Sequence, residues 1–432
     1  MRRFLTLVIV ALLATMPALY LRLTGWYPSP LLDTALFGVG ILAAGFMLSW
    51  GAEAAESRIS QGLILAIVAL VTVLPEYAVD IYYAYMAGRG GPASPYVQYA
   101  AANMTGANRL LVGVAWPLMV FLHWAKDRHR SIDLPPGNAT EIGFLLLASL
   151  YSFVIVLKDT ITLADFAVLL AIFGLYLWRV RKSDKPDEGS GEEEEPGPAA
   201  ALRVLSPAAQ WAAMAALAGV AAGVILLSAE PFAEAMVGAG RTLGINEFLL
   251  IQWLAPLASE APAIVIAILF VRANRSGDGL IAMISDKINQ WTLLVGMLPL
   301  ALSIGAGAIS PLPLDARQGE EFFLTAAQSL FAIGLIARLR LTVWSSVALF
   351  GLFLVQVTLA FIFRDDEPRT ILTLTWLAWG YLVLAFVLFA VNARQLSAVV
   401  VQALTGRRSP VLSPREGDTA SVGTTRPEVL QP

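Results

Sequence analysis

Apolar runs long enough to cross a lipid bilayer recur along almost all of this 432-residue chain, and no other feature constrains its fold as strongly. About 20 apolar residues in a helix cross the core of a bilayer. Hydrophobic residues make up 57% of the sequence and charged residues only 14%, whereas soluble domains carry about 25% charged residues. The sequence therefore predicts an all-α, polytopic membrane protein and excludes an ordinary soluble domain.

Hydropathy windows of about 19 residues predict about twelve transmembrane helices. The expected spans are residues 4–22, 31–50, 62–87, 98–124, 142–157, 161–178, 208–228, 246–272, 280–303, 321–339, 342–363 and 370–392. The fourth span is long and the fifth is short, which predicts tilted or kinked helices there.

The distribution of lysine and arginine between the loops predicts the orientation. One set of alternate loops is rich in them: Arg2, Arg3, Arg58, Lys126, Arg128, Arg130, Arg179, Arg181, Lys182, Lys185, Arg203, Arg272, Arg275, Arg338, Arg340, Arg394, Arg407 and Arg408. The other set holds only Arg22, Arg89, Lys158, Arg241, Arg317, Arg364 and Arg369. Because basic loops stay in the cytoplasm, we expect a multi-pass protein of the inner or plasma membrane with both termini cytoplasmic.

Residues 1–22 allow two interpretations. A basic start followed by an apolar centre is typical of a retained first helix and also of a signal peptide. Either way residue 31 lies outside, so the orientation of the later helices is unchanged.

The polar stretches divide the chain into segments. Residues 181–207 contain a charged, Pro- and Gly-rich run that predicts an acidic cytoplasmic linker, and residues 405–432 predict a disordered tail. The remaining segments are an N-terminal helix in 1–30, a first repeat in 31–180, a second repeat in 208–363 and a C-terminal helix in 364–404.

Several classes of function are excluded by composition. The chain has no cysteine, so thiolate metal sites and cysteine catalysis are impossible. Its only histidines are His123 and His129, beside a basic loop, which removes most zinc-site and serine-triad interpretations. A net charge of −3 offers no basic surface for nucleic acid, and nothing in the sequence indicates a cofactor.

The two halves of the chain carry the same pattern of glutamates and prolines. The matching residues are Glu53 with Glu56 and Glu230 with Glu234 at a membrane edge, then Glu76 after Pro75 and Glu260 between Pro256 and Pro262. In the next helix, AANMTGANRLLVG ends at Gly113 and MISDKINQWTLLVG ends at Gly296. Aligning these glycines pairs Asn103 with Asp286, and Ala107 with Gln290.

The expected orientation makes these repeats inverted. The span holding Glu76 runs from inside to outside, whereas the span holding Glu260 runs from outside to inside. Inverted repeats with proline-interrupted helices at matching positions indicate a secondary transporter with a binding site near the middle of the membrane.

Four carboxylates lie within predicted spans, where an ionised carboxylate costs at least ~2.5–3.5 kcal/mol. They are Glu76, Asp80, Glu260 and Asp286. Helical spacing places Thr72, Glu76 and Asp80 on one face, and Asp286, Asn289 and Gln290 on another. The prolines also free the carbonyl oxygens of Val71, Gln252 and Ala258. Such oxygen ligands suit calcium or sodium, and desolvated carboxylates can also carry protons.

Some of these residues have a second interpretation. Asp80 lies nearer the outer end of its helix and could simply meet water. Asn289 and Gln290 could be hydrogen-bonding links between helices. Arg109 and Lys287 either neutralise a nearby acid in place of an ion or form structural ion pairs.

These motifs resemble those of the sodium/calcium exchanger (calcium/cation antiporter) superfamily. A Gly-Thr-Ser-x-Pro-Glu motif corresponds to Val71–Glu76 and Ala255–Glu260, and a Gly-Ser-Asn-x-x-Asn motif to Ala102–Ala107 and Ser285–Gln290. The resemblance, over roughly residues 31–363, implies two inverted repeats of five helices, with 1–22 and 370–392 as additions. It also implies that Glu76 and Glu260 are the central acidic ligands and that Asn103, Asp286 and Gln290 are polar ligands.

The chain departs from the family motifs at positions that help to form sodium sites. Val73 and Leu257 replace serines, Pro256 replaces a threonine, and Ala107 and Lys287 replace asparagines. Sodium as the counter-ion is therefore in doubt, and proton coupling or a different metal becomes more credible.

The sequence thus favours a transporter that exchanges a metal cation, calcium first, for sodium or protons by alternating access. The alternatives are a sodium/proton or proton-coupled metal antiporter on the same scaffold, and a non-transporting scaffold with degenerate sites. An intramembrane enzyme with Glu76 and Glu260 as acid and base is disfavoured, since no nucleophile or metal triad accompanies them. Ion flux in sealed vesicles would separate these functions.

Overall fold

The computed structural model describes residues 1–56, 73–182, 198–245, 247–407 and 409–412. The predictions for Thr72, for the Val71 carbonyl, for most of the acidic linker and for the tail beyond 412 lie outside the described residues.

Helices occupy the predicted spans, with the first part of the third span outside the described residues. They are α1 (Arg2–Thr24), α2 (Pro30–Glu56), α4 (Leu74–Gly90), α5 (Tyr96–Leu110), α6 (Trp116–Asp127), α7 (Ala139–Lys158), α8 (Leu163–Lys182), α9 (Pro207–Leu243), α10 (Glu247–Arg272), α11 (Ser276–Asn289), α12 (Val295–Ala306), α13 (Ala316–Ile336), α14 (Val343–Ile362), α15 (Glu367–Val391) and α16 (Ala393–Thr405). Single π-helical turns, Leu111–Ala115 and Gln290–Leu294, join α5 to α6 and α11 to α12, so each pair forms one long, locally widened helix.

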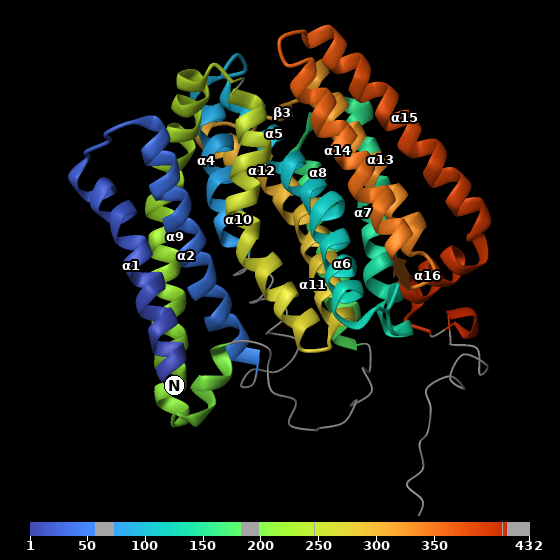
Figure 1. Ribbon diagram of the computed structural model, residues 1–432. Coiled ribbons are helices and arrows are strands. Elements are labelled where there is room, and N and C mark those ends of the chain that lie inside the picture. The colour runs from blue at the N-terminus through green and yellow to red at the C-terminus, as the bar shows by residue number, and fades with distance from the viewer. Residues whose placement is uncertain (57–72, 183–197, 246, 408, 413–432) are drawn as a thin grey trace, which may run out of the picture.

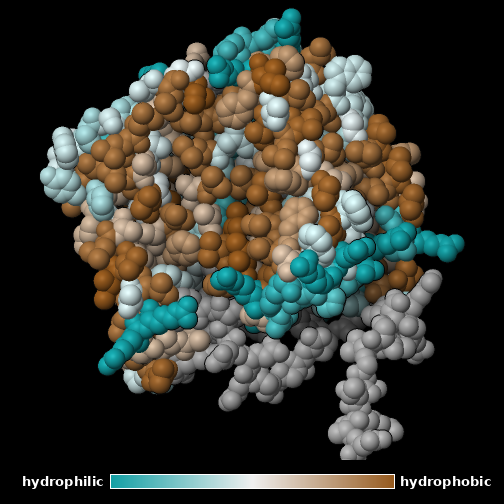
Figure 2. Space-filling model, in the orientation of Figure 1, coloured by the Kyte–Doolittle hydropathy of each residue, from teal (hydrophilic) through white to brown (hydrophobic). Residues whose placement is uncertain are grey.

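The surface has the distribution expected of a membrane protein. Ten helices among the described residues are long and apolar enough to cross a membrane. Figure 2 shows apolar residues over most of the flank and polar residues gathered along the lower edge and at the top. The helix α13 is more polar, with Arg317, Glu320 and Glu321 in its first turns, and it packs against α7 and α15 inside the bundle.

Two elements differ from the sequence predictions. The helix α9 does not end near residue 228 but continues to Leu243, past Pro231. A proline removes one backbone hydrogen bond, yet the extensive packing of α9 along α2 keeps the helix continuous. The short helix α16 was not predicted, and it follows α15 directly and packs against α7.

Four short strands make the relation between the two repeats visible. β1 (Ser131–Asp133) follows α6 and pairs antiparallel with β4 (Arg340–Thr342), which precedes α14. β3 (Leu312–Pro313) follows α12 and pairs with β2 (Thr160–Ile161), which precedes α8. Exchanging the repeats converts one strand pair into the other, as a two-fold relation between the halves requires.

Matched glycines bring each repeat against the last helix of the other. A Cβ atom at Gly113 would lie 2.4 Å from the Phe353 ring on α14, and a Cβ atom at Gly296 would lie 3.1 Å from the Phe166 ring on α8. Only glycine permits the first of these contacts. The two repeats are therefore interlocked through equivalent positions.

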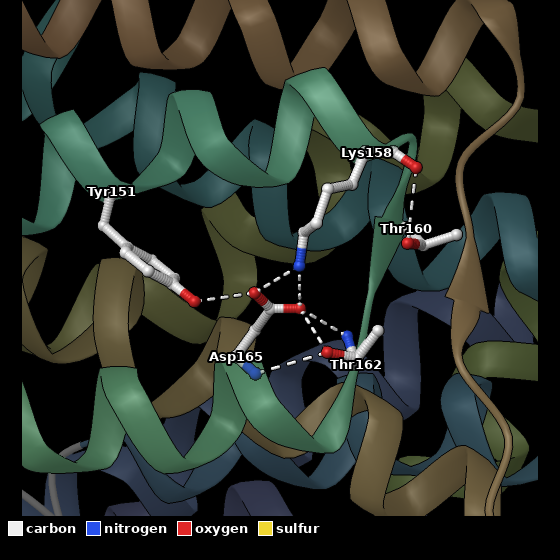
Figure 3. Close-up of polar contacts among 5 residues, drawn as sticks. All are labelled: Tyr151, Lys158, Thr160, Thr162 and Asp165. Atoms are coloured by element: carbon white, nitrogen blue, oxygen red, sulfur yellow. Dashed lines mark hydrogen bonds and ion pairs between the residues drawn. The ribbon is translucent and has the colours of Figure 1, made fainter.

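A buried carboxylate fixes the turn that leads into α8 (Figure 3). Asp165 accepts hydrogen bonds from Tyr151 (2.7 Å), from the Lys158 ammonium (2.6 Å) and from both the backbone N–H and the hydroxyl of Thr162 (2.7 Å each). Asp165 therefore caps the start of α8 and sets the position of the next residue, Phe166, against α12.

Helix packing positions the centre of the bundle. The helix α4 packs against α12, α10 packs against α5, and α2 lies along α9. The predicted additions α1 and α15 lie at opposite edges of the molecule (Figure 1), where α1 contacts α2 and α15 contacts α13.

Candidate cation-binding site

Glu76 and Glu260 meet inside the bundle. Glu76 lies in the first turn of α4, directly after Pro75, with 1% of its surface exposed. Glu260 lies in α10 between two prolines and is 3% exposed. Their carboxyl groups are within hydrogen-bonding reach of each other. A hydrogen bond between two carboxyl groups requires a proton on one of them, because two ionised carboxylates have no donor.

The second long helix of the second repeat extends this cluster. Gln290 donates a hydrogen bond from Nε2 to Oε1 of Glu260, and Asp286 lies within hydrogen-bonding reach of the same carboxyl group. Gln290 is fully buried, whereas Asp286 is partly exposed. The structure therefore brings both predicted polar residues of the second repeat to Glu260.

The first repeat contributes the pair of Asp80 and Asn103. The Asn103 side chain donates from Nδ2 to Oδ1 of Asp80 at 2.8 Å. Asp80 follows Glu76 by one turn of α4 and is 0% exposed. The alternative in which Asp80 simply meets water therefore does not fit its position.

Asn289 is engaged in a link between helices. Its Oδ1 accepts a hydrogen bond of 2.8 Å from the hydroxyl of Tyr77, which joins α11 to α4. Tyr77 directly follows Glu76, so this bond also fixes the turn that carries the central glutamate. In the sequence, only the position of Tyr77 next to Glu76 pointed to it as a residue of this cluster.

The two buried cations have different surroundings. Arg109 forms an ion pair of 2.6 Å with Glu321 on α13, both 1% exposed, and its guanidinium lies 5.1 Å from the centre of the Trp253 ring. Of the two alternatives given for Arg109, this contact matches the structural ion pair. Lys287 instead donates to two oxygens of Asn108. Glu321 was not among the predicted site residues, since its partner lies more than 200 residues away in sequence.

Buried oxygen atoms without donors mark the site. No amide, hydroxyl or ammonium group of the described residues donates to the following buried oxygens: Glu76 Oε1 and Oε2, Asp80 Oδ2, Asn103 Oδ1, Asp286 Oδ2 and Gln290 Oε1. Buried polar atoms usually have hydrogen-bond partners, so a cluster of unsatisfied acceptors is suited to a cation. In the described part of the chain, no three acidic or histidine side chains already surround one point as a metal cage. The acids instead lie one after another, from Asp80 and Glu76 in the first repeat to Glu260 and Asp286 in the second.

A glycine allows the helices around the site to approach closely. A Cβ atom at Gly106 in α5 would lie 1.8 Å from the carbonyl oxygen of Gln252 in α10. That carbonyl is the one that Pro256 was predicted to free, and the structure turns it toward α5. Gly106 therefore sets the distance between the helices that carry Asn103 and Glu260.

The edge glutamates of the second repeat are bound by neighbouring side chains. Glu230 pairs with Arg22 of α1 at 2.6 Å, and Glu234 accepts hydrogen bonds from Tyr82 and Tyr96. The side chains of Glu53 and Glu56 lie outside the described residues.

Both repeats match a family model described as sodium/calcium exchanger protein, over residues 30–181 and 214–362. The chain belongs to this family. It is a multi-pass membrane protein and a cation antiporter with two inverted repeats. No curated protein is similar enough to the chain to match it.

Solved exchanger structures share the fold. The H+/Ca2+ exchanger CAX is 37% identical, with a TM-score of 0.85 over 94% of this chain and 99% of that one. The protein YfkE is 14% identical, with a TM-score of 0.59 over 82% of this chain and 98% of that one. The sodium-calcium exchanger NCX_Mj is 18% identical, with a TM-score of 0.51 over 76% and 97% of the two chains. The latter two support the fold alone.

Proposed function

We propose that this antiporter exchanges calcium for protons at the site formed by Glu76 and Glu260. The observation that carries the proposal is the approach of these two buried carboxyl groups beside oxygen atoms that have no donor. The same pair can hold a proton between its oxygens or, when fully ionised, a divalent cation. It cannot hold both fully, because the proton occupies an oxygen that the cation would use.

The oxygen set favours calcium. Calcium takes about six to eight oxygen ligands, including carboxylates and amide oxygens. Glu76 and Glu260 offer carboxylate oxygens, with Asp286 beside Glu260, and Asn103 and Gln290 offer amide oxygens. The similarity to an H+/Ca2+ exchanger at 37% identity supports the same choice.

Sodium is less well supported as the counter-ion. The buried Val73 and the exposed Leu257 have no hydroxyl oxygen to offer. Pro256 likewise has neither a hydroxyl nor a backbone donor. Protons need no such ligands, because the carboxylates themselves accept them.

The proposed exchange follows from competition within one site. When the site faces the side with more protons, protonation of Glu76 or Glu260 weakens calcium binding and releases the ion. When it faces the other side, loss of the proton restores the charge that attracts calcium. Access alternates because the inverted repeats can exchange their conformations around the site.

We also propose that the protein lies in the inner or plasma membrane with both termini in the cytoplasm. Arginine-rich loops meet where Ser131 pairs with Thr342, and Lys126 donates to the Val271 and Arg272 carbonyls nearby. Basic loops of this kind stay on the cytoplasmic side. Accessibility of single cysteines introduced at Arg130 and Arg364 to a membrane-impermeant thiol reagent would test this orientation.

Flux measurements on purified protein test the exchange. Proteoliposomes loaded at low pH and diluted into high pH should take up radioactive calcium, and a sodium gradient of equal size should not drive uptake. Protein-free vesicles give the background. Uptake driven by sodium and not by pH would contradict proton coupling, and absence of calcium flux under either gradient would contradict calcium as the substrate.

A further inference from the structure

Lys287 is a buried cation that the proposed exchange does not use. It lies in α11 at 0% exposure, directly after Asp286 and three residues before Gln290. Its ammonium donates to Asn108 on α5, to the backbone carbonyl at 3.1 Å and to Oδ1 at 3.0 Å. It also lies 4.8 Å from the centre of the Trp291 ring. These contacts fix the position of the charge but supply no negative partner.

Within the described ranges, Lys287 lacks the carboxylate partner that Arg109 has. Arg109 has Glu321 at 2.6 Å, whereas no carboxylate of the described residues forms an ion pair with Lys287. Burying an unpaired ammonium costs several kcal/mol. Two charged groups act on Lys287 over a longer distance: Arg109, which opposes its charge, and Glu76, which favours it.

The two repeats differ at this position. Aligning Gly113 with Gly296 places Lys287 opposite Met104, which is also fully buried. The same alignment places Asp286 opposite Asn103. The second repeat thus carries an acid and a base where the first repeat carries two neutral side chains. The ammonium is an asymmetric feature of a site that is otherwise built from matching residues.

We propose that Lys287 is a fixed cation that takes the place of one mobile monovalent cation and thereby excludes sodium from the site. This inference rests on the proposed calcium/proton exchange. The carboxylates of Glu76, Asp80, Glu260 and Asp286 carry four negative charges when ionised, and one ammonium leaves three. A calcium ion at Glu76 and Glu260 and a single proton on Asp80 balance three charges. Without the ammonium, one more monovalent cation is required.

The first test removes the charge and keeps the contact. Lys287→Gln retains an amide donor for Asn108 but is neutral. In proteoliposomes, calcium uptake by the wild type should be unaffected when sodium replaces an impermeant organic cation. Uptake by the variant should become sodium-sensitive, and its half-saturating calcium concentration at high pH should fall on the order of tenfold, because a repelling unit charge has been removed.

Two further variants separate charge from packing. Lys287→Arg keeps the charge and should keep the insensitivity to sodium. Asn108→Leu removes the Oδ1 contact but leaves the charge, so it should lower the thermal unfolding temperature without creating a sodium response. A sodium response in Asn108→Leu equal to that in Lys287→Gln would assign the effect to helix packing and overturn the proposal.

The outcomes distinguish this inference from the proposed function. If the wild type shows no pH-driven calcium uptake, the proposed function fails. If the wild type shows it and Lys287→Gln has unchanged calcium affinity and no sodium response, the fixed-cation role fails. If Lys287→Gln and Lys287→Met both fail to fold while Lys287→Arg folds, the charge serves folding and the proposal is again overturned.

Discussion

Two clusters of buried charge lie within this membrane protein, and they are built differently. At the centre, acids from both repeats gather with acceptor oxygens that receive no donor, so acceptors are in excess. Beside it, Arg109 and Glu321 form a closed pair in which each charge has its partner at 2.6 Å. Burial is therefore not what distinguishes the candidate site. The excess of acceptors without donors distinguishes it, because such oxygens are suited to a cation.

The largest expected effect is loss of transport when a central carboxylate is neutralised. Glu76→Gln or Glu260→Gln preserves size but removes one charge from the oxygen set, in a medium where each missing charge is costly. Calcium uptake should fall to background, at least a hundredfold, while the unfolding temperature is unchanged or higher. Glu367→Gln, an exposed residue at the start of α15, is the matched control. Full flux in either central variant would make these carboxylates structural.

Breaking the closed pair should instead affect stability. Arg109→Met or Glu321→Met leaves one buried charge without a partner, which costs about 3–5 kcal/mol. The double variant removes both charges and should regain most of that loss, as thermal unfolding in detergent would show. It should also transport calcium. A double variant that folds as well as the wild type but carries no flux would place Arg109 and Glu321 in the transport machinery.

A smaller effect is expected from closing the gap between α5 and α10. Gly106→Ala places a methyl group where the Gln252 carbonyl lies 1.8 Å away, and such overpacking costs about 1–3 kcal/mol. Because the helices carrying Asn103 and Glu260 are pushed apart, calcium affinity should fall as well. Gly380→Ala in α15 is the control, since a Cβ atom there meets nothing within 4 Å. Equal stability of the two variants in thermal unfolding would contradict the close approach.

The smallest effect is expected from shortening the linker between the repeats. Deleting residues 186–198 removes most of the acidic linker between the repeats, including Glu192–Glu195. Calcium flux and its pH dependence should stay within experimental error of the wild type. A changed calcium dependence in the deletion variant would show that the linker takes part in regulation.

Much of the fold could be predicted because its main determinant is local. A helix must be long and apolar to cross a bilayer, and this property can be read from consecutive residues. The pairing of Glu76 with Glu260 also followed from sequence, since inversion of two matching repeats brings equivalent positions together. The second charge cluster could not be found in this way. The partner of Arg109 is chosen by the packing of α5 on α13, which no local pattern encodes.

Several backbone features could likewise not be predicted from the sequence. The π-helical turns at Leu111–Ala115 and Gln290–Leu294 arise within long apolar helices that have no proline at those residues. The extension of α9 past Pro231 depends on its contact with α2. The strands are two or three residues long, too short to produce an alternating pattern.

In the part of the chain that the structure describes, the four short strands link some of the helices to one another and leave α2 and α9 without such links. Antiparallel hydrogen bonds tie the loop after α6 to the loop before α14, and the loop after α12 to the loop before α8. These cross-links restrain relative displacement of the helices next to them. No strand of the described residues adjoins α2 or α9, which contact each other along their length. We therefore expect the helices next to the strands to move little relative to one another. The displacement that exposes the ions to alternate sides should be concentrated in α2 and α9.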